Sequence, residues 1–208
     1  MTPPDTARPF RRPLATAAAG ATLAAMLVAA CGGGSPLDNA PTLSNPPGAG
    51  GQKLSFVYFQ RCVYPVLNTP LPININGTVS TNNCTAGGCH DNVTGTGGAL
   101  RLLANTPAAD LAQTAAVLRS TDMYKNYYSS LGETVVGVPD QSRLLNKPLV
   151  RGVLHGGGLI FETPDDAGAK LMRYWINRPM PSGQDEFSVA ANTMFANGDP
   201  VNGACNTD

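Results

Sequence analysis

Charge is scarce in this 208-residue chain, in which Asp, Glu, Lys and Arg make up only 13% of residues and the formal net charge is zero. A chain without net charge has no long-range attraction for a polyanion, so we expect no nucleic acid as a partner. The sequence also lacks a nucleophile elbow, a phosphate-binding loop and a paired metal-ligand spacing. Gly (23) and Pro (18) are abundant instead. The length of the chain predicts a single domain, and the number of Gly and Pro residues indicates that much of it is loop.

The first 30 residues have the pattern of an export signal. Three arginines lie within residues 8–12, before an Ala- and Leu-rich run over 14–30. A charged start followed by an apolar middle is typical of a signal peptide, and the run is shorter than the roughly 20 strongly apolar residues of a membrane-spanning helix. The Val-Ala-Ala that precedes Cys31 resembles the bacterial lipoprotein box, which implies lipidation of Cys31. An ordinary cleaved signal, or a twin-arginine route at Arg11-Arg12, would also export the chain.

Residues 31–52 follow as a tether of Gly, Pro, Ser, Asn and Ala without apolar periodicity. This composition predicts a flexible linker between a lipid membrane anchor and a folded domain over 53–208. Gly32, with no Asp at that position, favours the outer membrane by resemblance to lipoprotein sorting. We therefore expect a membrane-anchored domain that faces the periplasm or the cell surface.

Helical signals dominate the folded part, and no convincing pair of alternating strands is apparent. We therefore expect an all-α domain of short helices and long loops, with residues 68–83 as a loop that leads to the next cysteines. The two clearest helices, over 56–64 and 165–177, are expected to pack together. The expected segments are 56–64, capped by Ser55 and stopped by Pro65; 107–118; short turns near 124–128 and 142–145; 165–177; and 185–196.

The most distinctive motif is Cys84-Thr-Ala-Gly-Gly-Cys89-His90. Two thiols followed directly by a histidine can hold a haem, through thioethers to its vinyl groups and a bond from His90 to the iron. The spacing here is Cys-x4-Cys-His rather than Cys-x2-Cys-His, and Gly87-Gly88 makes the longer loop conformationally easy. A small disulfide between Cys84 and Cys89 is the alternative. A zinc site is less favoured because the chain has only two histidines.

The order of short motifs around this site resembles c-type cytochrome domains of the planctomycete type and, more loosely, class I cytochromes c. The likeness covers about residues 54–180 and departs from the family in the cysteine spacing and at Arg178-Pro179-Met180-Pro181, where Gly-Ala-Pro is usual. It implies a small cytochrome c-like fold, one covalent haem c on Cys84 and Cys89, and His90 as the proximal iron ligand. The motifs are Phe56, Pro65-Val66-Leu67, the cysteine motif, Gly97-Gly98-Ala99-Leu100, Leu144-Leu145, His155-Gly156-Gly157, Phe161, Leu171 and Trp175-Ile176.

If haem is bound, two residues are candidates for the distal iron ligand. His155 lies in a glycine-flanked loop that can approach a flat macrocycle closely, and the resemblance favours it. Met180 lies between two prolines, a rigid setting for a thioether ligand. The choice matters because a Met/His pair raises the reduction potential relative to His/His.

Cys62 and Cys205 are the thiols left over once Cys31 is lipidated and two cysteines hold haem. In an oxidising compartment they are candidates for a disulfide. The expected function is an electron carrier rather than an enzyme, with redox proteins as partners. Two alternatives remain: a haem c domain with an open iron site that acts as a peroxidase or sensor, and a disulfide-stapled lipoprotein without haem.

Overall fold

The computed structural model describes residues 53–75, 77–189 and 205. These all belong to one compact unit. The expected signal peptide over 1–30, the lipidated Cys31 and the linker to residue 52 lie outside the described residues. Within the described part, no helix is both long and apolar enough to cross a membrane.

The chain enters the core through one helical stretch made of three segments, α1 (Phe56–Tyr58), a π-helical turn η1 (Phe59–Val63) and α2 (Tyr64–Asn68). Ser55 caps it as expected, and its Oγ accepts a 3.0 Å hydrogen bond from the Tyr58 N–H. The expected stop at Pro65 is wrong. The wider π turn precedes the proline, which falls in the first turn of α2, where its missing N–H is tolerated.

Helix α6 (Ala167–Ile176) packs against this stretch, which confirms the expected pairing. The buried Trp175 indole donates a 2.8 Å hydrogen bond to the Ser55 carbonyl, and its ring centroid lies 5.3 Å from that of Phe59. The sequence separation is 120 residues. The contact thus joins the two ends of the described domain in one core.

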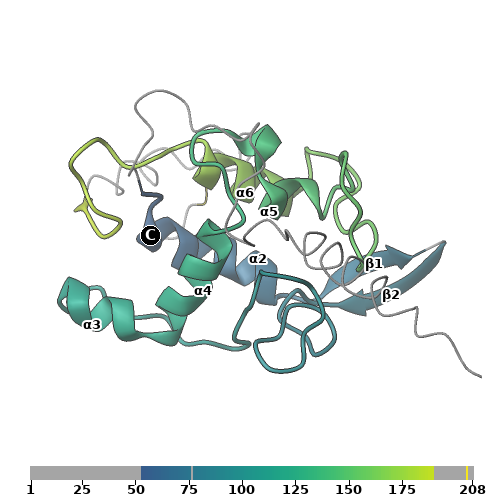
Figure 1. Cartoon of the computed structure of the whole chain (residues 1–208), viewed down its shortest axis with the longest axis horizontal. Helices are drawn as coiled ribbons and strands as arrows, with labels where there is room; N and C mark the ends of the chain where they lie inside the picture. Colours follow the sequence, from purple (N-terminus) through teal and green to yellow (C-terminus); the bar gives the residue numbers. More distant parts are fainter. Residues whose placement is uncertain (1–52, 76, 190–204, 206–208) are drawn as a thin grey trace, which may run out of the picture. The chain divides into compact units, whose positions relative to one another are not determined.

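The expectation of an all-α domain is wrong, because residues 68–83 include a β-hairpin and the fold is mixed. Strands β1 (Leu71–Ile75) and β2 (Thr78–Asn82) pair antiparallel, from Leu71 opposite Asn82 to Ile75 opposite Thr78. Two residues separate the strands, and their sequence, Asn76-Gly77, is the strongest dipeptide signal for a tight hairpin. Gly77 has φ +83°, a conformation that favours glycine. Figure 1 shows the hairpin at one side of the fold, near the loop after α5 (Arg143–Asn146).

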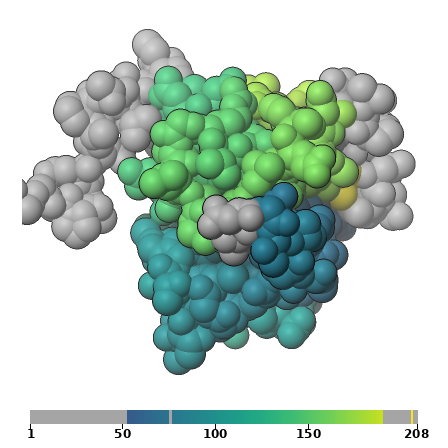
Figure 2. All heavy atoms as spheres, turned by 90° about the vertical axis from the view of Figure 1, so that its right-hand side faces the viewer, coloured from purple at the N-terminus to yellow at the C-terminus, as the bar shows by residue number. Residues whose placement is uncertain are grey.

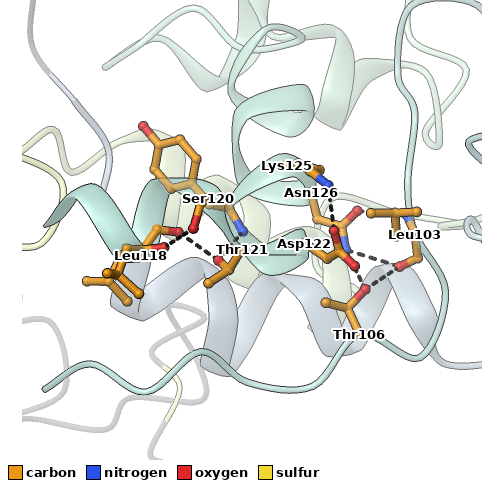
Figure 3. A network of polar contacts seen from close by, with 10 residues as sticks. Leu103, Thr106, Leu118, Ser120, Thr121, Asp122, Lys125 and Asn126 are labelled. Carbon is orange, nitrogen blue, oxygen red and sulfur yellow. Dashed lines mark hydrogen bonds and ion pairs between the residues drawn. The ribbon is translucent and has the colours of Figure 1, made fainter. Parts of the chain in front are cut away.

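The expected helix over 107–118 begins later, because Thr114 caps α3 (Ala115–Ser120). Thr121 then caps α4 (Asp122–Leu131), which is longer than the turn expected there. Thr106 joins a polar network instead (Figure 3). The buried Asn126 accepts from the Leu103 N–H at 2.7 Å and donates to the Leu103 carbonyl at 3.0 Å and to Thr106 Oγ1 at 3.0 Å. This network attaches the 101–106 segment to α4.

The remaining expected segments are only partly helical. A 3₁₀ turn, η2 (Pro139–Gln141), precedes α5, and the helix expected over 165–177 begins at Ala167 with Asp166 as its N-cap residue. Residues 185–188 form a turn rather than the start of a helix, and 190–196 lie outside the described residues.

Two contacts fasten the C-terminal part of the chain to the core. A disulfide joins Cys62 to Cys205, with the Cα atoms 5.8 Å apart. The buried Glu186 accepts hydrogen bonds from Arg119 Nε at 3.0 Å and from the Tyr124 hydroxyl at 2.7 Å. Burial alone would raise the pKa of Glu186, but the hydrogen bonds from Arg119 and Tyr124 outweigh it and leave the pKa below its ordinary value of 4.5.

We therefore expect Glu186→Gln to lower the free energy of unfolding at neutral pH, because the neutral amide pairs less well with Arg119. A carboxylate with a depressed pKa contributes stability above 4.5, and this contribution is lost as the pH falls through the lower folded-state value. Urea unfolding at several pH values should show the two proteins converge in acid. Glu162→Gln, at an exposed side chain, is the control and should follow the wild type. A constant difference between Glu186→Gln and the wild type at every pH would contradict the assignment.

Candidate functional site

The loop that carries the two cysteines is held by backbone hydrogen bonds on both sides. The Cys84 N–H donates to the Leu67 carbonyl at the end of α2, and the His90 N–H donates back to the Cys84 carbonyl, both at 3.0 Å. Gly88, with φ +83°, allows the chain to turn between the cysteines. The loop therefore closes on itself and brings both cysteines and His90 to one place.

His90 is fixed at two points by the segment that follows the loop. The Leu102 N–H donates to the His90 carbonyl at 2.7 Å, and the His90 Nδ1 lies 3.2 Å from the Leu100 carbonyl oxygen. Since a carbonyl can only accept, Nδ1 carries the proton, which leaves a lone pair on Nε2. Burial lowers the pKa of His90 more than the bond to Leu100 raises it. The neutral imidazole, which is the form that binds a metal, is favoured.

Two polar side chains of helix α4 bind the backbone of residues 101–103. The Arg101 N–H donates to Ser129 Oγ at 2.7 Å, and the Leu103 N–H donates to Asn126 Oδ1, also at 2.7 Å. These bonds satisfy the backbone N–H groups on either side of Leu102, whose own N–H faces His90. The position of His90 thus depends on two polar side chains of a helix more than thirty residues later in the chain.

Gly97 lies directly against the His90 ring. A Cβ at this position would overlap Nδ1 and Cε1 of His90 and would lie 2.8 Å from the Cys89 carbonyl oxygen. The Gly97 N–H also donates to that carbonyl at 2.8 Å. Only glycine leaves enough space for the imidazole here.

The second histidine, His155, lies near His90 although it comes 65 residues later in the sequence. The Asn74 and Leu159 backbones pair as an isolated antiparallel bridge, which attaches the loop containing His155 to the hairpin. In Figure 2, the green spheres of the segment that includes this loop lie above the blue and teal spheres of the hairpin and the residues after it. The His155 Nδ1 lies 2.8 Å from the Gly158 carbonyl oxygen. As in His90, Nε2 is left with the lone pair.

The two imidazoles are parallel and separated. Their centroids are 6.2 Å apart and their planes differ by 12°. A bond from a histidine nitrogen to a first-row metal is about 2 Å, as in zinc sites, and the nitrogen lies about 1.1 Å from the ring centre, given ring bonds of about 1.3 Å. Two imidazoles on opposite sides of one iron would therefore have centroids about 6 Å apart. The observed centroid spacing is close to this value.

A cavity of about 460 Å³ opens beside this pair, a size within the range of small-molecule and cofactor sites. Its lining has apolar residues from the hairpin, both cysteines, both histidines and several glycines. The residues are Leu71, Ile73, Ser80, Asn82, Asn83, Cys84, Gly88, Cys89, His90, Thr96, Gly97, Gly98, Lys147, His155, Gly156, Gly157 and Ile160. An apolar wall with a few convergent polar groups suits a flat, mostly apolar ligand.

The two cysteines of the motif are free thiols rather than a disulfide. The Asn82 amide lies 3.7 Å from Cys89 Sγ. Burial, helped by the proximity of Cys89, raises the pKa of the Cys84 thiol to about 12. Cys84 therefore stays protonated and is slow to oxidise. Among the described residues no three His, Cys, Asp or Glu side chains form a cluster suited to a bare metal ion.

Met180, the other candidate for the distal ligand, does not line this cavity. It is only 2% exposed, its N–H donates to the Lys53 carbonyl at 2.7 Å, and it is absent from the cavity lining. Of the sequence-predicted residues, the structure thus brings together Cys84, Cys89, His90 and His155. Sequence reasoning did not single out Lys147 as a cavity residue, because nothing in the local pattern links α5 to the cysteine motif.

Comparison with known proteins adds no relative: no family model, no curated protein and no solved structure matches the chain. The site is therefore interpreted from its own geometry.

We predict that Gly97→Ala destabilises the domain by about 1–3 kcal/mol, the usual range for an added group in a packed site. The reason is the overlap of the new Cβ with the His90 ring. Urea unfolding measures the loss, and histidine side-chain NMR should show a displaced His90. Gly132→Ala is the matched control, since its Cβ would meet nothing nearer than 3.4 Å. Equal stability of the two variants would show that the ring does not need this space.

Proposed function

We propose that this protein is an exported electron carrier that holds one covalent haem c between His90 and His155. The observation that carries the proposal is the pair of parallel imidazoles 6.2 Å apart, each with Nδ1 bound to a backbone carbonyl. The residues present fit haem: two free thiols precede His90, Gly97 leaves room for its ring, and an apolar cavity adjoins the pair.

Each residue has a defined part in this proposal. The S–H groups of Cys84 and Cys89 add across the two vinyl double bonds, so that a C–S bond forms at one carbon, hydrogen goes to the other, and no oxidant is consumed. The Nε2 atoms of His90 and His155 would bind the iron. Bound haem supplies one-electron chemistry, in which iron cycles between its ferric and ferrous states.

The surrounding structure favours electron transfer over catalysis at the iron. With His155 in the sixth position, peroxide or a gas would have to displace a histidine that is held by Gly158. The backbone hydrogen bonds at Nδ1 would hold both rings in a fixed tautomer and orientation. One-electron donor and acceptor proteins are the partners this function requires.

Export and a lipid anchor on Cys31 belong to the same proposal, and the sequence supports both. A lipid-anchored carrier on the outer membrane would stay within reach of its redox partners. The haem maturation chemistry and the Cys62–Cys205 disulfide both suit an exported protein.

The test is an optical spectrum and a pyridine haemochrome assay on protein made with a cytochrome c maturation system. We expect about one covalent haem per chain and none in the Cys84→Ala, Cys89→Ala double variant. The wild type should show a six-coordinate spectrum that added carbon monoxide does not change. His155→Ala should open the iron to carbon monoxide, because it removes the sixth ligand.

Met180→Leu is the matched control, since it alters the competing candidate without touching the cavity lining. It should keep the wild-type spectrum. The absence of covalent haem from matured wild-type protein would overturn the proposed function. A spectrum altered by Met180→Leu but not by His155→Ala would keep the cytochrome and reject the assigned ligand.

A further inference from the structure

The residues that line the main cavity include a positive charge but no negative one. The main cavity has one cation, Lys147, and no carboxylate among its lining residues. A smaller cavity of about 30 Å³ shares part of this wall and adds Glu133 and Arg143. The four residues common to both cavities are Cys84, His90, Lys147 and His155. Lys147 thus lines both cavities together with Cys84 and the two histidines.

A backbone hydrogen bond holds Lys147 in place, and no ion pair involves its side chain among the described residues. It follows α5 directly, and its N–H donates to the Arg143 carbonyl at 3.0 Å. The side chain is half-buried, yet within the described part of the chain its ammonium has no carboxylate partner. By contrast, the side chains of Arg151 and Arg173 both form ion pairs with Asp140. An ammonium that has no carboxylate partner can pair with an anionic ligand.

The position of Glu133 limits where an anion can bind. The smaller cavity of about 30 Å³ is lined by Glu133 as well as by Arg143, whereas the main cavity of about 460 Å³ is lined by Lys147 and by no acid. An anionic group would therefore approach Lys147 from the main cavity. Haem is a flat apolar molecule with two carboxylates on one edge, which matches an apolar wall with a single cation.

We propose that Lys147 binds the carboxylate edge of the tetrapyrrole and makes the site selective for an anionic macrocycle. This inference rests on the proposed function. Attachment through Cys84 and Cys89 would hold one side of the macrocycle, and Lys147 would hold the carboxylate edge. A charge-assisted hydrogen bond at such a partly exposed site is expected to change affinity by about tenfold.

The experiment uses the full-length Cys84→Ala, Cys89→Ala chain, so that porphyrins bind reversibly. Iron protoporphyrin and its dimethyl ester, which lacks the two charges, are titrated by Soret absorbance. We expect the free acid to bind about ten times more tightly than the ester. Lys147→Gln should lose this preference by weakening only the free acid, and Lys147→Arg should keep most of it. Lys125→Gln, at an exposed lysine paired with Asp122, is the control and should not change either affinity.

Each result decides between the two proposals. Equal affinity for acid and ester in the lysine-containing chain would overturn the role of Lys147 while leaving haem binding intact. If Lys147→Gln weakened binding of the free acid and of the ester equally, Lys147 would have a structural role, and its proposed role in binding the carboxylate edge would be overturned. Failure of both porphyrins to bind, together with no covalent haem in the matured wild type, would overturn the proposed function itself.

Discussion

The hydrogen bonds between His90 and the 100–102 segment are the constraint on which the site depends. The Leu102 N–H holds the His90 backbone, and the Leu100 carbonyl holds Nδ1 of the ring. The ring therefore cannot rotate without losing a buried hydrogen bond, and its tautomer cannot change without placing a lone pair against a carbonyl oxygen. A metal ligand that is oriented in this way before the metal binds loses little entropy on binding.

The rest of the domain keeps that segment and its partner in position. Helix α4 binds the 101–103 backbone through Ser129 and Asn126. The hairpin lines the cavity with Leu71 and Ile73 and pairs at Asn74 with the loop of His155. The hairpin is therefore more than a connection to the cysteines. It forms one wall of the cavity and also determines where the second histidine arrives.

The two histidines differ in how firmly they are held. His90 is 8% exposed and bound by both its backbone and its ring, whereas His155 lies in a glycine-rich loop and is half-buried. Under the proposed function this asymmetry suits the assembly of a covalent haem protein. The more firmly held histidine is the one next to the attachment cysteines.

The sequence by itself determined the local chemistry. Cys84, Cys89 and His90 lie close together in the chain, so their grouping needs no tertiary information, and the Ser55 cap of the first core helix could be predicted for the same reason. The dipeptide Asn76-Gly77 is also typical of a hairpin, but the prolines and asparagines around it favoured a loop. What only the tertiary structure decided depends on contacts between distant segments. It placed His155 rather than Met180 opposite His90, added Lys147 to the cavity, and put Gly97 against the imidazole. Local periodicity could not supply these results, because each depends on how the hairpin, α4 and α5 pack around one shared space.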